Sequence, residues 1–207
     1  NGALFLDEFP EFSRTVLETL RQPLETGDVV VARANAHVRY PCRFMLIAAA
    51  NPCKCGYLSD PERACGRAPL CGEDYLGRIS GPMMDRFDIR IDVPPVTIRD
   101  LSDSPRGEDS SVVAERVAAA RDKQTQRYQG VEGVTTNASA EGDLLEEVGK
   151  LSVESKELLT VASEKFRLSA RAYYRVQRVA RTIADLDHSD TVEKPHLAEA
   201  LSYRLAG

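Results

Sequence analysis

The sequence reads ALFLDE at residues 3–8 and FMLIAAANP at residues 44–52. Each stretch is a short apolar run of the kind that forms a buried strand of a parallel sheet. The first run ends in two carboxylates, Asp7 and Glu8, and the second ends in the amide Asn51. Open α/β sheets bind their ligands beyond the carboxyl ends of the strands. We therefore predict an α/β fold. A polar site formed by these three side chains is one interpretation, and a solvated strand end at Asp7 and Glu8 and a turn at Asn51 are the alternatives.

The alternation of strands and helices continues to about residue 98. Apolar residues at helical spacing predict a helix that begins at Ser13 and is ended by Pro23. We further predict two strands of a hairpin at residues 29–32 and 37–40. A short helix is expected within residues 78–87, and a third strand of the sheet at residues 89–93. Residues 1–98 thus form one α/β domain in this interpretation.

The secondary-structure pattern of the sequence changes after residues 99–110. This stretch is polar and contains Pro and Gly, which is typical of a linker. Residues 111–207 contain only helical patterns, which predicts an all-α domain. We expect its helices at residues 111–129, 144–148, 152–166, 169–186 and 194–204.

Composition narrows the class of protein. With 27 Lys and Arg against 32 Asp and Glu, the net charge is −5, which excludes nucleic-acid binding by bulk positive charge but leaves room for a local basic face. The apolar run at residues 44–50 is far shorter than the roughly 18 residues that cross a membrane, so we expect no membrane partner. Five cysteines, an odd and clustered set, favour a reducing compartment such as the cytoplasm.

The cysteines are concentrated in one loop. Cys53 and Cys55 are separated by one residue, nine residues then precede Cys65, and five more precede Cys71. Four thiolates at such spacing predict a structural zinc site, and free thiols are the alternative. Cys42 lies outside the pattern and is expected to be a small core residue.

Several separate stretches carry a family resemblance: NGALFLDEFPEFSRTVLETLRQPLE, IAAANPCKCGY, RISGPMMDRFDI and LSARAYYRVQRVARTIADL. They occur in the order seen in magnesium-chelatase-like AAA+ proteins of the ComM/YifB type, which are related to magnesium chelatase ATPase subunits and MCM helicases. The resemblance implies that residues 1–98 are the C-terminal half of an AAA+ P-loop ATPase core. It also implies that residues 111–207 are the helical lid domain.

The resemblance assigns a role to six side chains around ATP and Mg²⁺. Asp7 and Glu8 resemble the Walker B acids, for Mg²⁺ and for activation of the attacking water. The other four resemble sensor 1 (Asn51), the arginine finger that reaches a neighbouring subunit (Arg86, with Arg78 as a second candidate) and sensor 2 (Arg171).

Two further groups of basic residues suggest anion binding. In helicase relatives a hairpin before sensor 1 touches DNA, and here it carries Arg33, His37 and Arg39, although an ordinary exposed hairpin is the alternative. Arg175 and Arg178 follow Arg171 along one helix face without a nearby acid. A phosphate, an acidic partner or solvent would have to compensate these like charges.

The phosphate-binding motif G-x-x-x-x-G-K-[ST] is absent from the 207 residues. We therefore expect this chain to be the C-terminal part of a larger ATPase and to be inactive by itself. The resemblance implies that the full-length protein forms a homohexameric ring that remodels DNA by branch migration. The alternatives are a chelatase motor that acts on a protein partner, and a non-catalytic interaction module stabilised by zinc.

Overall fold

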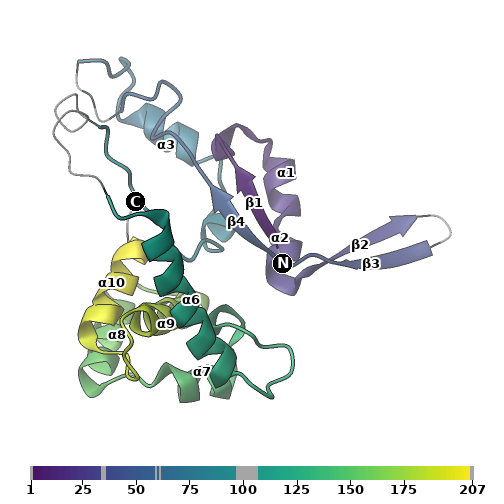
Figure 1. The fold of residues 1–207 in the computed structure, drawn as a ribbon. Coiled ribbons are helices and arrows are strands. Elements are labelled where there is room, and N and C mark those ends of the chain that lie inside the picture. Colours follow the sequence, from purple (N-terminus) through teal and green to yellow (C-terminus); the bar gives the residue numbers. More distant parts are fainter. Residues whose placement is uncertain (1, 34–35, 59, 61, 97–106, 206–207) are drawn as a thin grey trace. The chain divides into compact units, whose positions relative to one another are not determined.

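The structure, a computed structural model, describes residues 2–33, 36–58, 60, 62–96 and 107–205 (Figure 1). The chain divides into two compact units, Asn1–Phe87 and Asp88–Gly207. The first unit is mixed α/β and the second is helical, so the predicted order of an α/β part before an all-α part is confirmed. The division lies before residue 98, where the sequence suggested it, and most of the predicted linker at 99–110 lies outside the described residues.

The first unit is built around a parallel pair of strands, β1 (Gly2–Leu6) and β4 (Phe44–Ala48), paired in register from Gly2 with Phe44 to Leu6 with Ala48. We expected both strands to be buried, and this is wrong for one face of the pair. Leu6 and Leu46 pack against the core, whereas the side chains of Phe5 and Met45 are 60% and 61% exposed. The reason is that the described elements of this unit cover only the face that carries Leu6 and Leu46.

Short helices cover that face and form the core of the unit. The elements are η1 (Phe9–Glu11), α1 (Arg14–Thr19), α2 (Arg21–Thr26) and α4 (Gly81–Met84). The core consists of buried Phe9, Leu17, Ile79 and Met83. Ser13 caps α1 as predicted, by accepting a hydrogen bond from the backbone N–H of Val16.

Pro23 does not end the helical segment, in contrast to the prediction. The segment breaks earlier, at Leu20, and Pro23 lies in the first turn of α2. A backbone N–H has no helical partner in a first turn, so proline is tolerated there. The segment ends at Gly27, which adopts the left-handed conformation with φ of 70°.

The predicted hairpin is confirmed as β2 (Asp28–Arg33) and β3 (Ala36–Pro41), which pair antiparallel. In Figure 1 the hairpin extends away from the parallel pair. Residues 34–35, which connect the two strands, lie outside the described residues.

The structure differs from the prediction at two further places, one before and one after the boundary between the two units. The cysteine-rich segment contains an additional helix, α3 (Leu70–Leu76), which the sequence analysis did not identify. Residues 89–93 form no strand in the part of the chain that the structure describes. The alternating pattern Ile-Arg-Ile-Asp-Val suggests a half-buried strand, but here Ile91 and Val93 are exposed and the N–H of Arg90 donates to the carbonyl oxygen of Tyr203.

The helical unit follows the predicted order of helices closely. Its elements are α6 (Ser110–Arg127), η2 (Asn137–Ser139), α7 (Gly142–Gly149), α8 (Val153–Lys165), α9 (Ala170–Leu186) and α10 (Lys194–Leu205). Val176 and Ala180 of α9 form the centre of a core that includes Leu159 of α8 and Leu197 of α10. Among the described residues, no helix has the length and apolar character needed to cross a membrane.

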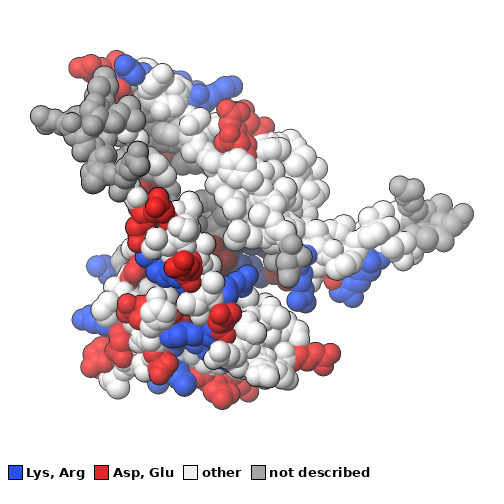
Figure 2. Space-filling model, in the orientation of Figure 1, with Lys and Arg blue, Asp and Glu red and all other residues white. Residues whose placement is uncertain are grey.

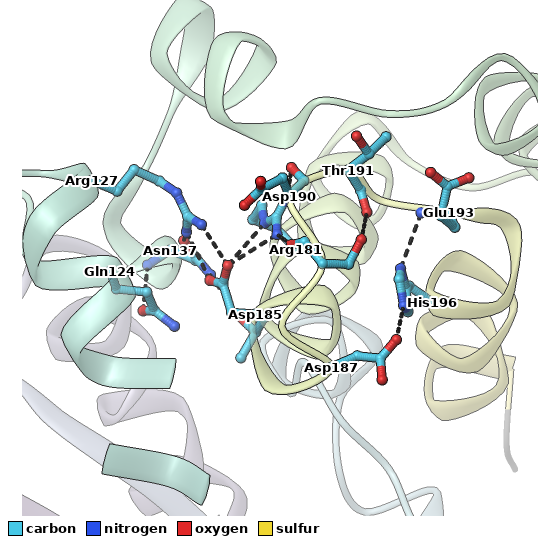
Figure 3. Close-up of polar contacts among 12 residues, drawn as sticks. Gln124, Arg127, Asn137, Arg181, Asp185, Asp187, Asp190, Thr191, Glu193 and His196 are labelled. Carbon is cyan, nitrogen blue, oxygen red and sulfur yellow. Dashed lines mark hydrogen bonds and ion pairs between the residues drawn. The ribbon is translucent and has the colours of Figure 1, made fainter. Parts of the chain in front are cut away.

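A buried polar network crosses this unit between α6, η2 and α9 (Figure 3). The carboxylate of Asp185 is fully buried and accepts hydrogen bonds from Arg127 at 2.7 Å, Asn137 at 2.8 Å and Arg181 at 3.0 Å. The Gln124 side chain accepts from the N–H of Asn137 at 3.1 Å. The network therefore ties η2 to both long helices, and sequence reasoning did not identify it.

Candidate functional site

The carboxyl ends of β1 and β4 are joined beyond the strands themselves. The N–H of Ala49 donates to the carbonyl oxygen of Leu6 at 2.9 Å, and the N–H of Phe9 donates to that of Ala49 at 2.9 Å. The turn that carries Asp7 and Glu8 therefore lies beside the segment that leads into Asn51. All three side chains are exposed, and the structure places them at one edge of the sheet, as the sequence predicted.

The turn itself is held in a specific conformation. Glu8 adopts the left-handed conformation, with φ of 49° and ψ of 43°, which is uncommon for a residue with a side chain. Its N–H donates to Oδ1 of Asp7 at 2.9 Å, so the carboxylate of Asp7 is oriented by the backbone. Two adjacent carboxylates with free oxygen atoms can supply the ligands that Mg²⁺ prefers and a base for proton transfer.

Arg78 lies close to the same segment. Its Nη1 is 3.4 Å from Oε2 of Glu11 and 3.5 Å from the carbonyl oxygen of Pro10, and its guanidinium carbon lies 5.8 Å from the centre of the Tyr75 ring. These contacts hold a side chain that is still 47% exposed, at the rim of a shallow depression of about 400 Å³. Arg78 is thus oriented and also accessible to a ligand.

Tyr75 is a residue of this region that sequence reasoning missed. It is buried, and its pKa is raised by that burial and then by the negative charges of Glu11 and Glu8. The phenol therefore remains protonated beside these acids. Helix α3, which positions Tyr75, was not predicted because its residues lie among cysteines and glycines that indicate a loop.

Arg86, the predicted arginine finger, has a different environment. Its side chain is only 5% exposed and donates to Oε2 of Glu25 and, at 2.7 Å, to the carbonyl oxygen of Pro82. In this conformation the guanidinium contacts its own unit. A finger must reach a neighbouring subunit, and of the two candidates Arg78 is the one with an exposed side chain.

The arginines of α9 separate into two groups. Arg171 lies exposed in the first turn, where sensor 2 was predicted. Arg175 pairs with Asp88 at 2.9 Å, and Arg178 donates to the carbonyl oxygen of Ala140 at 2.8 Å. The expectation that an anion or solvent compensates these two charges is therefore wrong, because the compensating groups come from distant positions of the same unit. Burial also lowers the pKa of Arg175.

The hairpin offers one well-defined cation. The side chain of Arg39 is 73% exposed, and its Nε donates to Oδ2 of Asp28 at 2.6 Å, which lowers the pKa of that carboxyl group. His37 is exposed on the same strand, and Arg33 lies in β2 with its side chain outside the described part. In Figure 2 a patch of basic atoms lies on the lower side of the hairpin.

The cysteine loop brings thiols together. The Sγ atoms of Cys53, Cys55 and Cys71 all lie within 4.8 Å of one another, with Cys53 and Cys55 3.0 Å apart. The neighbouring Cys65 thiol, together with burial, raises the pKa of Cys71 to about 12. Hydrogen bonds from Cys53 and from the backbone N–H groups of Tyr57 and Cys65 lower the pKa of Cys55 to about 6. Three of the four cysteines selected from the spacing, Cys53, Cys55 and Cys71, thus form one cluster.

Comparison with known proteins identifies a family for this chain. Residues 1–101 match the family model of magnesium chelatase, subunit ChlI, and residues 107–204 match that of the ChlI C-terminal region. The chain is 42% identical over 205 residues to competence protein ComM of Haemophilus influenzae, which covers 99% of this chain and 39% of that protein. It is 41% identical over 206 residues to YifB of Escherichia coli, covering 99% of this chain and 39% of YifB. The chain thus spans about two fifths of the length of these curated relatives. It belongs to the magnesium-chelatase-like family, of the ComM and YifB type.

Proposed function

We propose that the protein containing this chain is an AAA+ ATPase that hydrolyses ATP at the edge formed by Asp7, Glu8 and Asn51. The observation that carries the proposal is the backbone connection between the ends of β1 and β4. It brings two acids and one amide to the edge where α/β proteins bind nucleotides. Membership in a family that includes magnesium chelatase subunit ChlI supports it.

Each residue has a distinct chemical task in this proposal. Asp7, oriented by the N–H of Glu8, holds Mg²⁺, which neutralises charge on the phosphates when it is bound. Glu8 accepts the proton of the attacking water, and the amide of Asn51 orients that water. Arg78, Arg86 and Arg171 are the candidates for neutralising the transferred phosphoryl group. In a homohexameric ring, such an arginine would act on a neighbouring subunit.

The test of the ATPase proposal is Glu8→Gln. In the full-length protein, removal of the general base should lower the ATP turnover number by about 10²–10⁴-fold while ATP binding persists. Glu115→Gln, an exposed acid of α6, is the matched control and should leave both unchanged. Equal turnover in the Glu8→Gln variant and the wild type would overturn the assignment. We expect residues 1–207 alone to hydrolyse no ATP, since they contain no P-loop motif.

We further propose that this ATPase remodels DNA, with the β2–β3 hairpin as the contact. The exposed charge of Arg39 and the neighbouring His37 suit phosphate contacts, which a ring of subunits would repeat. One relative, at 42% identity, is a competence protein. DNA should therefore stimulate ATP hydrolysis, and the stimulation should weaken as salt concentration rises.

Two variants of the same ion pair test the hairpin contact. Arg39→Gln and Asp28→Asn both break the pair between these residues, but only the first removes a positive charge. Arg39→Gln should reduce stimulation by DNA, whereas Asp28→Asn should preserve or increase it. If both variants reduce it equally, the hairpin contributes through its fold alone and the DNA contact is refuted.

A chelatase motor is the second candidate function, because both units match models of magnesium chelatase subunit ChlI. Its partner would be a protein that carries out metal insertion. Stimulation of ATP hydrolysis by such a partner, and none by DNA, would favour this function over the first.

A further inference from the structure

The loop between β4 and α3 places cysteine side chains from two segments of sequence next to each other. Cys53 is fully buried, and its Sγ lies within 4.8 Å of those of Cys55 and Cys71. Zinc binds thiolates at about 2.3 Å, so two thiolates of a tetrahedral site lie about 3.8 Å apart. A shift of about an ångström in the side chains would bring the three sulfur atoms to these positions.

We propose that this loop binds one structural zinc ion through four thiolates, those of Cys53, Cys55, Cys65 and Cys71. Three of these thiols already lie together, and Cys65 is the remaining cysteine of the loop, since Cys42 lies outside it. The site is therefore complete without a histidine or water. A closed set of four protein ligands is typical of structural zinc.

The backbone around Cys55 supports the same conclusion. The N–H of Gly56 donates to the carbonyl oxygen of Cys53 at 3.0 Å, with Gly56 at φ of 79°. This turn needs a glycine and directs both flanking thiols to the same side.

A second glycine keeps the two ligand segments close. A Cβ atom on Gly72 would lie 2.6 Å from Cδ2 of Leu58 and 3.0 Å from the carbonyl oxygen of Pro52. Gly72 follows Cys71, and Pro52 precedes Cys53, so the absence of a side chain allows these ligands to approach. Gly72→Ala should therefore weaken zinc retention even though it leaves every thiol in place.

The metal would act on the arrangement of the unit rather than on the reaction. It would fasten the segment after Asn51 to the start of α3, the helix that carries Tyr75 and leads to Arg78. Zinc binding is independent of the ATPase proposal, because it is measured without nucleotide.

The experiment is to measure zinc in the protein purified under reducing conditions, by inductively coupled plasma mass spectrometry. We expect one zinc per chain in the wild type and in Cys42→Ser, whose cysteine lies outside the loop. Cys53→Ser, Cys65→Ser and Cys71→Ser should each lose zinc. Absence of zinc from the wild type, with no binding when Zn²⁺ is added, would overturn the site.

Cobalt substitution of the wild type tests the ligand set independently of the folding of any variant. Four thiolates around Co²⁺ give the intense ligand-field bands of a tetrahedral site together with sulfur-to-metal charge transfer. A spectrum of octahedral Co²⁺ would refute the proposal. Full zinc retention in Cys65→Ser would refute the four-thiolate assignment.

Discussion

The buried network around Asp185 gives the sharpest prediction for stability. Asp185→Asn preserves the size of the side chain and removes its negative charge. The variant then leaves the guanidinium of Arg181, which is 1% exposed, without its buried counter-charge. Removing one partner of a buried charged pair costs about 3–5 kcal/mol, because the remaining charge stays out of water. A second cation, Arg127, loses the same partner, which adds to the cost.

This magnitude sets the expected shift in thermal stability. Each 1 kcal/mol lowers the melting midpoint by roughly 4–8 °C in a domain of about this size. We therefore expect Asp185→Asn to lower the midpoint of the helical unit by at least about 10 °C, followed by circular dichroism. The chain has two compact units, so the unfolding transition of the helical unit must be measured separately from that of the first unit.

A surface ion pair in the same unit provides the control. Glu141 is 81% exposed on its side chain and lies 3.4 Å from Arg178. Exposed pairs contribute about 0–1 kcal/mol, so Glu141→Gln should change the midpoint by only a few degrees. If Asp185→Asn shifts the midpoint no more than Glu141→Gln does, the reasoning from burial is refuted.

The dependence on pH provides an independent check. Burial alone would raise the pKa of Asp185, but hydrogen bonds from Arg127 and Asn137 and the charge of Arg181 outweigh it and lower the pKa. A carboxyl whose folded pKa lies below the unfolded value of about 3.9 stabilises the protein above that pH and less as the pH falls. The difference in midpoint between wild type and Asp185→Asn should thus shrink below about pH 4. A constant difference would contradict this.

Three further predictions concern the first unit. Arg86→Ala should lower the melting midpoint of this unit, since the Arg86 side chain is 5% exposed. Arg78→Ala should change the midpoint by only a few degrees but should lower ATP turnover. The reverse result, with stability lost in Arg78→Ala and only turnover lost in Arg86→Ala, would identify Arg86 as the arginine finger. Leu17→Ala should cost about 2–5 kcal/mol in urea unfolding, because Leu17 is 2% exposed, and a cost under about 1 kcal/mol would refute its core position. Asp28→Asn should increase sensitivity of the hairpin to proteolysis, with unchanged cleavage contradicting the role of its ion pair with Arg39.

Local chemistry explains why much of the fold could be predicted. Caps at Ser13, Ser152 and Ser169 mark helix starts by a contact within three residues, and the structure shows all three. The acids after β1 and the amide after β4 follow their strands directly, so parallel pairing was enough to place them at one edge.

Other features depend on partners far away in the sequence. Residues 89–93 have the alternation of a strand, but a strand also needs a neighbour to pair with, and the backbone of Arg90 bonds to Tyr203 instead. Likewise, Arg175 and Arg178 lack a nearby acid along their helix and find Asp88 and Ala140 across the unit. The periodicity of apolar residues along the sequence does not indicate contacts between residues so far apart.

The sequence by itself determined most of the elements and their order, the family, the three polar side chains at the sheet edge and the loop in which three cysteines cluster. Only the tertiary structure decided which arginines are exposed and which are paired, that Tyr75 lies among the acids, and that Asp185 joins three elements. The physical reason is the distance along the sequence between the residues that interact. Helix starts and strand ends are set by interactions between near neighbours, whereas burial and charge pairing depend on residues that meet only after the chain has folded.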